Sequence, residues 1–99
     1  MEDARRVLKA ELEKCRGRKV AAIEVIHGYG SSGVGGRLRR GIRKSLISLR
    51  KEKANKAVVL GENWSIFDPA TRLVMDQCPE LSKDKDLFAC NPGITVVLL

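Results

Sequence analysis

Hydrophobic positions along the chain change their spacing several times, and each spacing predicts one kind of element. Residues 3–16 place apolar side chains three or four positions apart, which predicts an amphipathic helix. Residues 20–26 form a short run rich in Val and Ile, which predicts a strand. Helical spacing returns over residues 36–50. The first half of the chain is therefore expected to fold as helix, strand and helix.

The second half continues with shorter elements. Residues 57–60 predict a buried strand, and the Asp-Pro pair at 68–69 starts a helix, with Asp as the N-cap and Pro at the first helical position. This helix should end near Gln77, before a Cys-Pro pair. Residues 80–91 are polar and predict an exposed loop, and residues 94–99 predict a third strand.

This order of elements indicates an α/β fold. The run at 20–26 is almost uniformly apolar, which is typical of a strand covered on both faces in a parallel sheet. We therefore expect a compact two-layer α/β sandwich with a mostly parallel, short sheet. A length of 99 residues predicts a single domain, residues 1–99.

Composition excludes several classes of protein. An apolar content of 43% excludes wholesale disorder, and no apolar run approaches the ~18–20 residues of a membrane helix. No secretory signal is apparent. Three widely spaced cysteines predict reduced thiols and a cytoplasmic location, and a single histidine argues against a zinc site. We expect neither a resident cofactor nor a membrane partner.

The charge is positive and unevenly distributed. The formal net charge is +7. Residues 1–56 hold 16 Lys/Arg and 6 Asp/Glu, whereas residues 57–99 hold 3 and 6. A basic first part with a mildly acidic remainder favours nucleic acid as the partner, although solubility alone is the alternative explanation.

The segment 27–36 contains five glycines and two serines. Glycine lets backbone N–H groups converge on an anion, Ser31 and Ser32 add hydroxyl donors, and the segment leads into a helix N-terminus, which is itself an anion site. A simple mobile connection is the alternative. The candidate contacts to nucleic acid are Gly28, Gly30, Ser31, Ser32, Gly33, Arg37, Arg39, Arg40, Arg43 and Lys44.

The cations among these residues crowd the N-terminal part of the helix. Such positions are unfavourable by ~0.3–1 kcal/mol each before screening, because the helix dipole is positive there. A bound phosphate backbone would compensate through Coulomb attraction and bidentate guanidinium contacts. An ordinary solvated face is the alternative interpretation.

Two nucleotide-binding motifs fit poorly. Gly28-x-Gly30-x-x-Gly33 matches the dinucleotide fingerprint, but cations follow at once and Glu62 lies beyond the expected offset of ~20 residues. The phosphate-loop pattern fails because Val34 stands where lysine should be. A nucleotide-binding fold stays the weakest alternative.

His27 is the single histidine and follows the first predicted strand. Imidazole titrates near neutral pH, so His27 is a candidate acid or base in phosphodiester cleavage. The alternative is that His27 caps the strand and fixes the loop by hydrogen bonds.

The stretch Val25-Ile26-His27-Gly28-Tyr29-Gly30, the further glycines and the Leu38-Arg39 pair resemble the core of the small MutS-related (Smr) domain. The preceding helix and the terminal segment Gly93 to Leu99 agree with this family, whereas residues 61–91 are interpreted as an insertion. The resemblance implies a fold like the C-terminal domain of translation initiation factor 3, binding to DNA or RNA, and nicking or endonuclease activity in some members. The positions carried over are His27, Gly28, Gly30 and Arg39.

The sequence departs from the family at its beginning. Smr domains normally start with a strand bearing Leu-Asp-x-His-Gly, and here Met1 starts directly in the first helix. Two hypotheses follow: a nucleic-acid-binding module without efficient catalysis, or a nicking endonuclease using His27. The second needs an acid from elsewhere, such as Asp68, Asp76 or a second subunit, or a divalent metal. The missing strand also predicts an open sheet edge through which a homo-oligomer can form.

Overall fold

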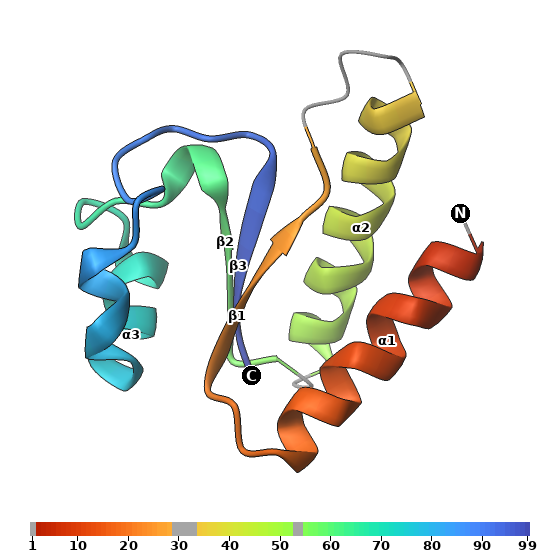
Figure 1. Cartoon of the computed structure of the whole chain (residues 1–99), viewed down its shortest axis with the longest axis horizontal. Coiled ribbons are helices and arrows are strands. Elements are labelled where there is room, and N and C mark those ends of the chain that lie inside the picture. Colours follow the sequence, from red (N-terminus) through yellow and green to blue (C-terminus); the bar gives the residue numbers. More distant parts are fainter. Residues whose placement is uncertain (1, 29–33, 53–54) are drawn as a thin grey trace.

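The computed structural model describes residues 2–28, 34–52 and 55–99, and Figure 1 shows how their elements are arranged. Most of the predicted elements are present, with ends shifted by one or two residues. The elements are α1 (Glu2–Gly17), β1 (Ala22–Ile26), α2 (Val34–Lys51), β2 (Ala57–Leu60), the 3-10 helix η1 (Gly61–Asn63), α3 (Pro69–Gln77), the 3-10 helix η2 (Pro79–Lys83) and β3 (Ile94–Leu98). The predicted loop at 80–91 thus contains most of η2.

The sheet has three strands in the order β1-β3-β2, and β3 pairs antiparallel with both neighbours. Val97 lies opposite Ile23 on one side and Val58 on the other. The prediction of a mostly parallel sheet is therefore wrong. β1 and β2 do run in the same direction, but β3 lies between them. The strand buried along its whole length is β3, whereas β1 is an edge strand.

Alternate side chains of β3 enter two separate cores. Val96 packs with Trp64 and Val74 on one face of the sheet. Val97 packs with Leu12 and Leu46 on the other. Helices α1 and α2 cover this second face and α3 covers the first, so the sheet lies between two helical layers (Figure 1). The two-layer prediction is also wrong, because α3, within the segment interpreted as an insertion, supplies a third layer.

The start of α3 follows the sequence prediction in atomic detail. Asp68 is the N-cap, its carboxylate accepts a hydrogen bond from the Thr71 N–H at 3.0 Å, and Pro69 is the first helical residue. Capping of this kind stabilises a helix by about 1 kcal/mol. Among the described residues, no helix is both long and apolar enough to cross a membrane.

A matched pair of glycine substitutions tests how closely the segment before β3 packs on η1. A Cβ on Gly61 would lie 1.9 Å from the Asn91 carbonyl oxygen and 2.8 Å from that of Ile94, so the backbone must move. Gly61→Ala is expected to cost about 3 kcal/mol and lower the melting temperature by roughly 10–20 °C. Gly17→Ala is the control, because nothing lies within 4 Å of its Cβ position. Circular dichroism melts measure both, and equal melting temperatures would contradict the close packing.

Candidate nucleic-acid interface

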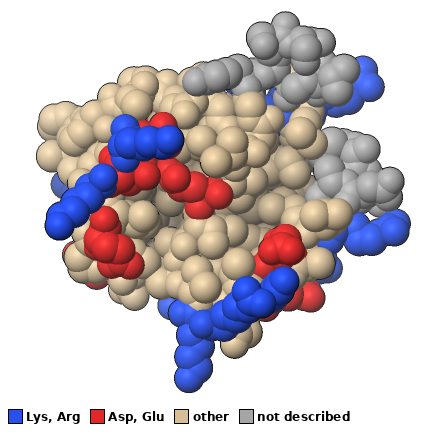
Figure 2. Space-filling model, in the orientation of Figure 1, with Lys and Arg blue, Asp and Glu red and all other residues tan. Residues whose placement is uncertain are grey.

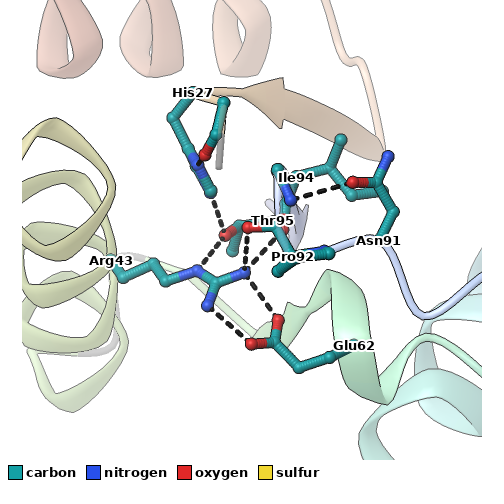
Figure 3. Close-up of polar contacts among 9 residues, drawn as sticks. His27, Arg43, Glu62, Asn91, Pro92, Ile94 and Thr95 are labelled. Atoms are coloured by element: carbon teal, nitrogen blue, oxygen red, sulfur yellow. Dashed lines mark hydrogen bonds and ion pairs between the residues drawn. The ribbon is translucent and has the colours of Figure 1, made fainter. Parts of the chain in front are cut away.

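The Arg43 side chain joins three parts of the fold. From α2 it reaches the start of β3, where Nε donates to Thr95 Oγ1 at 3.0 Å and Nη2 donates to the carbonyl oxygens of Ile94 at 2.9 Å and Pro92 at 3.2 Å. Nη1 and Nη2 also donate to the two carboxylate oxygens of Glu62, at 3.0 and 2.7 Å (Figure 3). The Arg43 side chain is only 12% exposed, so its donors are used in contacts within the protein.

The buried Thr95 hydroxyl is one reason why the Arg43 side chain points toward the sheet. Thr95 is the polar residue of a strand whose five positions are all buried, and its own exposure is 0%. A buried hydroxyl without a partner would destabilise the fold by about 1–3 kcal/mol. Thr95 Oγ1 lies within hydrogen-bond distance of both Arg43 Nε and His27 Nε2, at 3.0 and 2.9 Å. One hydroxyl thus links the helix, the central strand and the end of β1.

The partners of His27 define which ring nitrogen carries the proton. The Gly28 carbonyl can only accept, so Nδ1, at 2.9 Å, carries a proton and donates to it. Thr95 Oγ1 accepts from Arg43, and its own proton is then directed to Nε2. Burial, together with the charges of Arg43 and Arg39, lowers the pKa of His27, partly offset by the Gly28 hydrogen bond. The imidazole is therefore neutral near pH 7, and both nitrogens are occupied.

The first residues of the glycine-rich segment are anchored to the start of β3. The backbone N–H groups of His27 and Gly28 both donate to the Gly93 carbonyl at 3.0 Å. Gly28 has a φ of 85°, in the left-handed region that favours glycine, which accounts for this residue type at the turn. The candidate contacts Gly30, Ser31, Ser32 and Gly33 lie outside the described residues.

The other predicted cations of α2 are placed differently from Arg43. Arg37, Arg40 and Lys44 are exposed and Arg39 is half-buried. None of the four forms a hydrogen bond or ion pair with any residue that the structure describes, and the first turn of α2 contains no acid. The charge of Arg39 contributes to lowering the pKa of both His27 and Glu62, which places it on the side of the helix that faces them.

Sequence reasoning missed two residues of this network. Thr95 could have been found, because a threonine in a strand predicted to be buried needs a hydrogen-bond partner. Glu62 was compared only with the acid expected after the dinucleotide fingerprint, and its pairing with Arg43 depends on how η1, directly after β2, approaches α2. The Arg43 guanidinium holds the pKa of Glu62 below its usual value.

The acids suggested for a nuclease do not join His27. Asp68 caps α3, and Asp76 is also on α3, in the layer on the opposite face of the sheet. A group of three carboxylates that could hold a metal lies elsewhere: oxygens of Glu24, Asp84 and Asp86 are within 4.8 Å of one another. Burial, followed by the hydrogen bond and charge of Asp84 and the charge of Asp86, raises the pKa of Glu24 to about 7. Glu24 shares its face of β1 with Ala22, on the α3 side of the sheet.

These features together define a small basic α/β domain in which a buried histidine precedes a glycine-rich segment and an arginine-rich helix. A comparison with models of protein families matches residues 1–63 to the Smr domain. The match spans more than half of the 99 residues, and the chain belongs to the Smr domain family, which is of nucleic-acid-binding or nuclease type. Curated proteins and solved structures gave no match.

The Arg43 network makes a prediction about stability. Arg43→Lys keeps the charge but cannot reproduce the planar set of donors, so the Ile94 and Pro92 carbonyls and Thr95 lose partners. The expected loss in the free energy of unfolding is about 2–3 kcal/mol, measured by urea denaturation. Arg40→Lys, on the exposed side of the same helix, should change it by less than about 0.5 kcal/mol. Equal effects would contradict the anchoring role of Arg43.

The lowered pKa of His27 predicts a pH dependence with a definite sign. The unfolded chain binds the proton more readily, so the stabilising contribution of neutral His27 is complete above pH 6.5 and is lost as pH falls through the lower folded-state pKa. The difference in unfolding free energy between wild type and His27→Gln should therefore grow as pH rises from about 5 to about 7. Glu24, whose pKa is raised, makes a contribution to stability that falls as pH rises over the same range. This contribution is the same in wild type and His27→Gln, so it cancels when the two unfolding free energies are subtracted. A difference that shrinks over this range would contradict the assignment.

Proposed function

We propose that this protein binds the phosphate backbone of DNA or RNA through the exposed cations of α2 and the adjoining glycine-rich segment. The observation that carries the proposal is the contrast within one helix. Arg43 is fully engaged inside the protein, whereas Arg37, Arg40 and Lys44 project from it without a described partner. Side chains held away from the protein's own carboxylates are available to an external polyanion.

Helical periodicity supports a continuous contact surface. Arg37, Arg40 and Lys44 are separated by three and four residues, so they follow one another along one side of α2. The buried residues Ile42 and Leu46 lie on the other side. A row of cations over two turns suits the repeated charges of a nucleic-acid backbone, which a nucleic-acid-binding protein neutralises with Lys and Arg.

Local energetics point the same way. Arg37 and Arg40 lie in the first two turns of α2, where the helix dipole disfavours cations by ~0.3–1 kcal/mol each. Phosphate oxygens bound near these cations would offset their unfavourable interaction with the helix dipole. They can also accept hydrogen bonds from unpaired N–H groups at the helix start. In this proposal Gly30, Ser31, Ser32 and Gly33 contribute backbone and hydroxyl donors, and Gly28, whose N–H donates to the Gly93 carbonyl, anchors the start of this segment. Arg39 contacts phosphate beside His27.

The geometry favours binding over cleavage that depends on His27. A general base needs an available nitrogen near the reacting group. Both nitrogens of His27 have protein partners at 2.9 Å, and Glu62, the acid of this network, is paired with Arg43. His27 is therefore assigned as a positioning residue for the start of the glycine-rich segment.

A salt-resolved binding series with matched charge removals tests this function. Arg37→Ala combined with Arg40→Ala should weaken binding to single-stranded, duplex and branched DNA and RNA by about tenfold or more at low salt, and reduce the slope of log K against log salt by about 1–2. Arg72→Ala combined with Lys83→Ala removes the same charge from exposed positions on the α3 side and should leave the slope nearly unchanged.

Two results would contradict the proposal. One is equal weakening by both double variants, which would indicate a net-charge effect. The other is affinity that is indifferent to salt. Cleavage is monitored in the same tubes, and nicking by wild type that His27→Gln abolishes while binding persists would restore the endonuclease alternative.

A further inference from the structure

Cations continue to the far end of α2, beyond those assigned to the proposed function. Arg50 and Lys51 lie in the last turn of the helix, and both are exposed. Residues 34–56 contain nine Lys/Arg and a single acid, Glu52, and α2 itself contains no acid. A solvated helix face usually mixes both signs, since pairs of opposite charge three or four residues apart stabilise it. The basic surface of α2 therefore extends over the whole helix.

The row of cations on the outer side of α2 ends at Lys51. The positions four and seven residues after Lys44 are Ser48 and Lys51, which are exposed and lie on the same side of the helix as Arg37 and Arg40. At about 1.5 Å per residue, the row from Arg37 to Lys51 is roughly 21 Å long. In Figure 1, α2 extends over much of the height of the molecule. The face seen in Figure 2 differs from this row, because groups of carboxylates lie beside the cations there.

A pocket of about 420 Å³ lies where α2 ends and the chain leads into β2. Its lining residues are Arg50, Lys51, Asn55 and Lys56. The three cations are exposed, and the side chain of none of them forms a hydrogen bond or ion pair with any residue that the structure describes. The volume falls within the range of ~300–1,000 Å³ of small-molecule sites, so the pocket has room for a nucleotide unit and not only for a single ion.

Asn55 is the buried residue of this pocket, and it holds a fourth cation beside it. Asn55 is 3% exposed, its Oδ1 accepts a hydrogen bond from Arg16 Nη2, and its Nδ2 lies 3.5 Å from the Leu46 carbonyl oxygen. Arg16 Nε is buried without an acceptor among the described residues. Donors are therefore in excess at this end of the fold, and the side-chain acceptor of Asn55 is already used.

The helix dipole explains only part of this cluster. Cations are favoured in the last turn of a helix, which accounts for Arg50 and Lys51. Lys56 lies beyond the helix, and Arg37, at the other end of the row, lies where the dipole disfavours a cation. The C-terminal end of α2 opposes an anion with the equivalent of about half a unit charge, which is less than the summed charge of the four cations around the pocket.

We propose that this pocket is a second phosphate-binding site, occupied by the same nucleic-acid strand that follows the outer side of α2. The strand begins at Arg37, as in the proposed function on which this inference rests, and reaches the pocket past Lys44 and Lys51. Successive phosphates of one strand of B-DNA lie about 3.4 Å apart along its axis, so the length of the row corresponds to about six nucleotides. Nucleic acid is favoured over an acidic protein segment because the chain belongs to a family of nucleic-acid-binding or nuclease type.

Charge removal at the pocket tests the proposal on strands of two lengths. The probes are 12-nucleotide and trinucleotide DNA and RNA, and fluorescence anisotropy measures their binding to the full chain. Arg50→Ala combined with Lys56→Ala should weaken binding of the 12-nucleotide strands by about tenfold at low salt and reduce the slope of log K against log salt by about 1–2. A trinucleotide is too short to reach both ends of the row, so the ratio of 12-nucleotide to trinucleotide affinity should fall as well. Arg72→Ala combined with Lys83→Ala removes the same charge on the α3 side and should leave these quantities nearly unchanged.

Amide NMR locates the site without a substitution. The amides of Asn55 and Lys56 should shift when a 12-nucleotide strand is added. A response of these amides to millimolar inorganic phosphate but not to the strands would overturn the proposal and assign the pocket to a free anion. A blocked Glu-rich peptide that binds more tightly than the strands, and loses affinity in the Arg50→Ala/Lys56→Ala variant, would assign it to an acidic protein segment instead.

Failure of the second site and failure of the proposed function give different results. If Arg37→Ala/Arg40→Ala weakens binding while Arg50→Ala/Lys56→Ala does no more than the control, the second site is overturned and the proposed function stands. The reverse pattern would retain the pocket as a phosphate site and contradict the proposed contacts at the start of α2. An unchanged ratio of 12-nucleotide to trinucleotide affinity would overturn the continuous contact along α2.

Discussion

The Arg43 guanidinium is the interaction on which the site depends. Burying a cation is unfavourable unless its charge is paired and its protons have acceptors. Here a bidentate contact to Glu62, two carbonyls and the Thr95 hydroxyl meet both needs. Because these acceptors come from the segment after β2 and from the start of β3, one side chain fixes α2 against both. His27 then completes the network through the same hydroxyl.

This arrangement separates two roles within one basic helix. Arg43 faces the sheet and acts as a structural anchor, and the cations on the outer side of α2 remain available to a ligand. The match to the Smr domain ends at residue 63, whereas Thr95 and the carbonyls that hold Arg43 lie beyond it. The part of the chain that carries the family resemblance is therefore held in place by a strand from outside the matched range.

Two surfaces of opposite character result from the fold. The outer side of α2 is basic, and the edge at β1 is apolar with acidic borders. Their separation follows from the topology, since β1 is an edge strand and its Glu24 faces the α3 side.

The sequence by itself determined the local elements and the class of protein. Apolar spacing and the Asp68-Pro69 cap predict helices and strands because these signals act within a few residues. The His-Gly motif and Leu38-Arg39 identified the family for the same reason. Tertiary structure decided the strand directions, the third layer formed by α3 and the inward orientation of the Arg43 side chain. A uniformly apolar strand can pair in a parallel or an antiparallel sheet. An arginine side chain is buried against the sheet only when acceptors distant in sequence, such as Thr95 and Glu62, lie close enough to bind it.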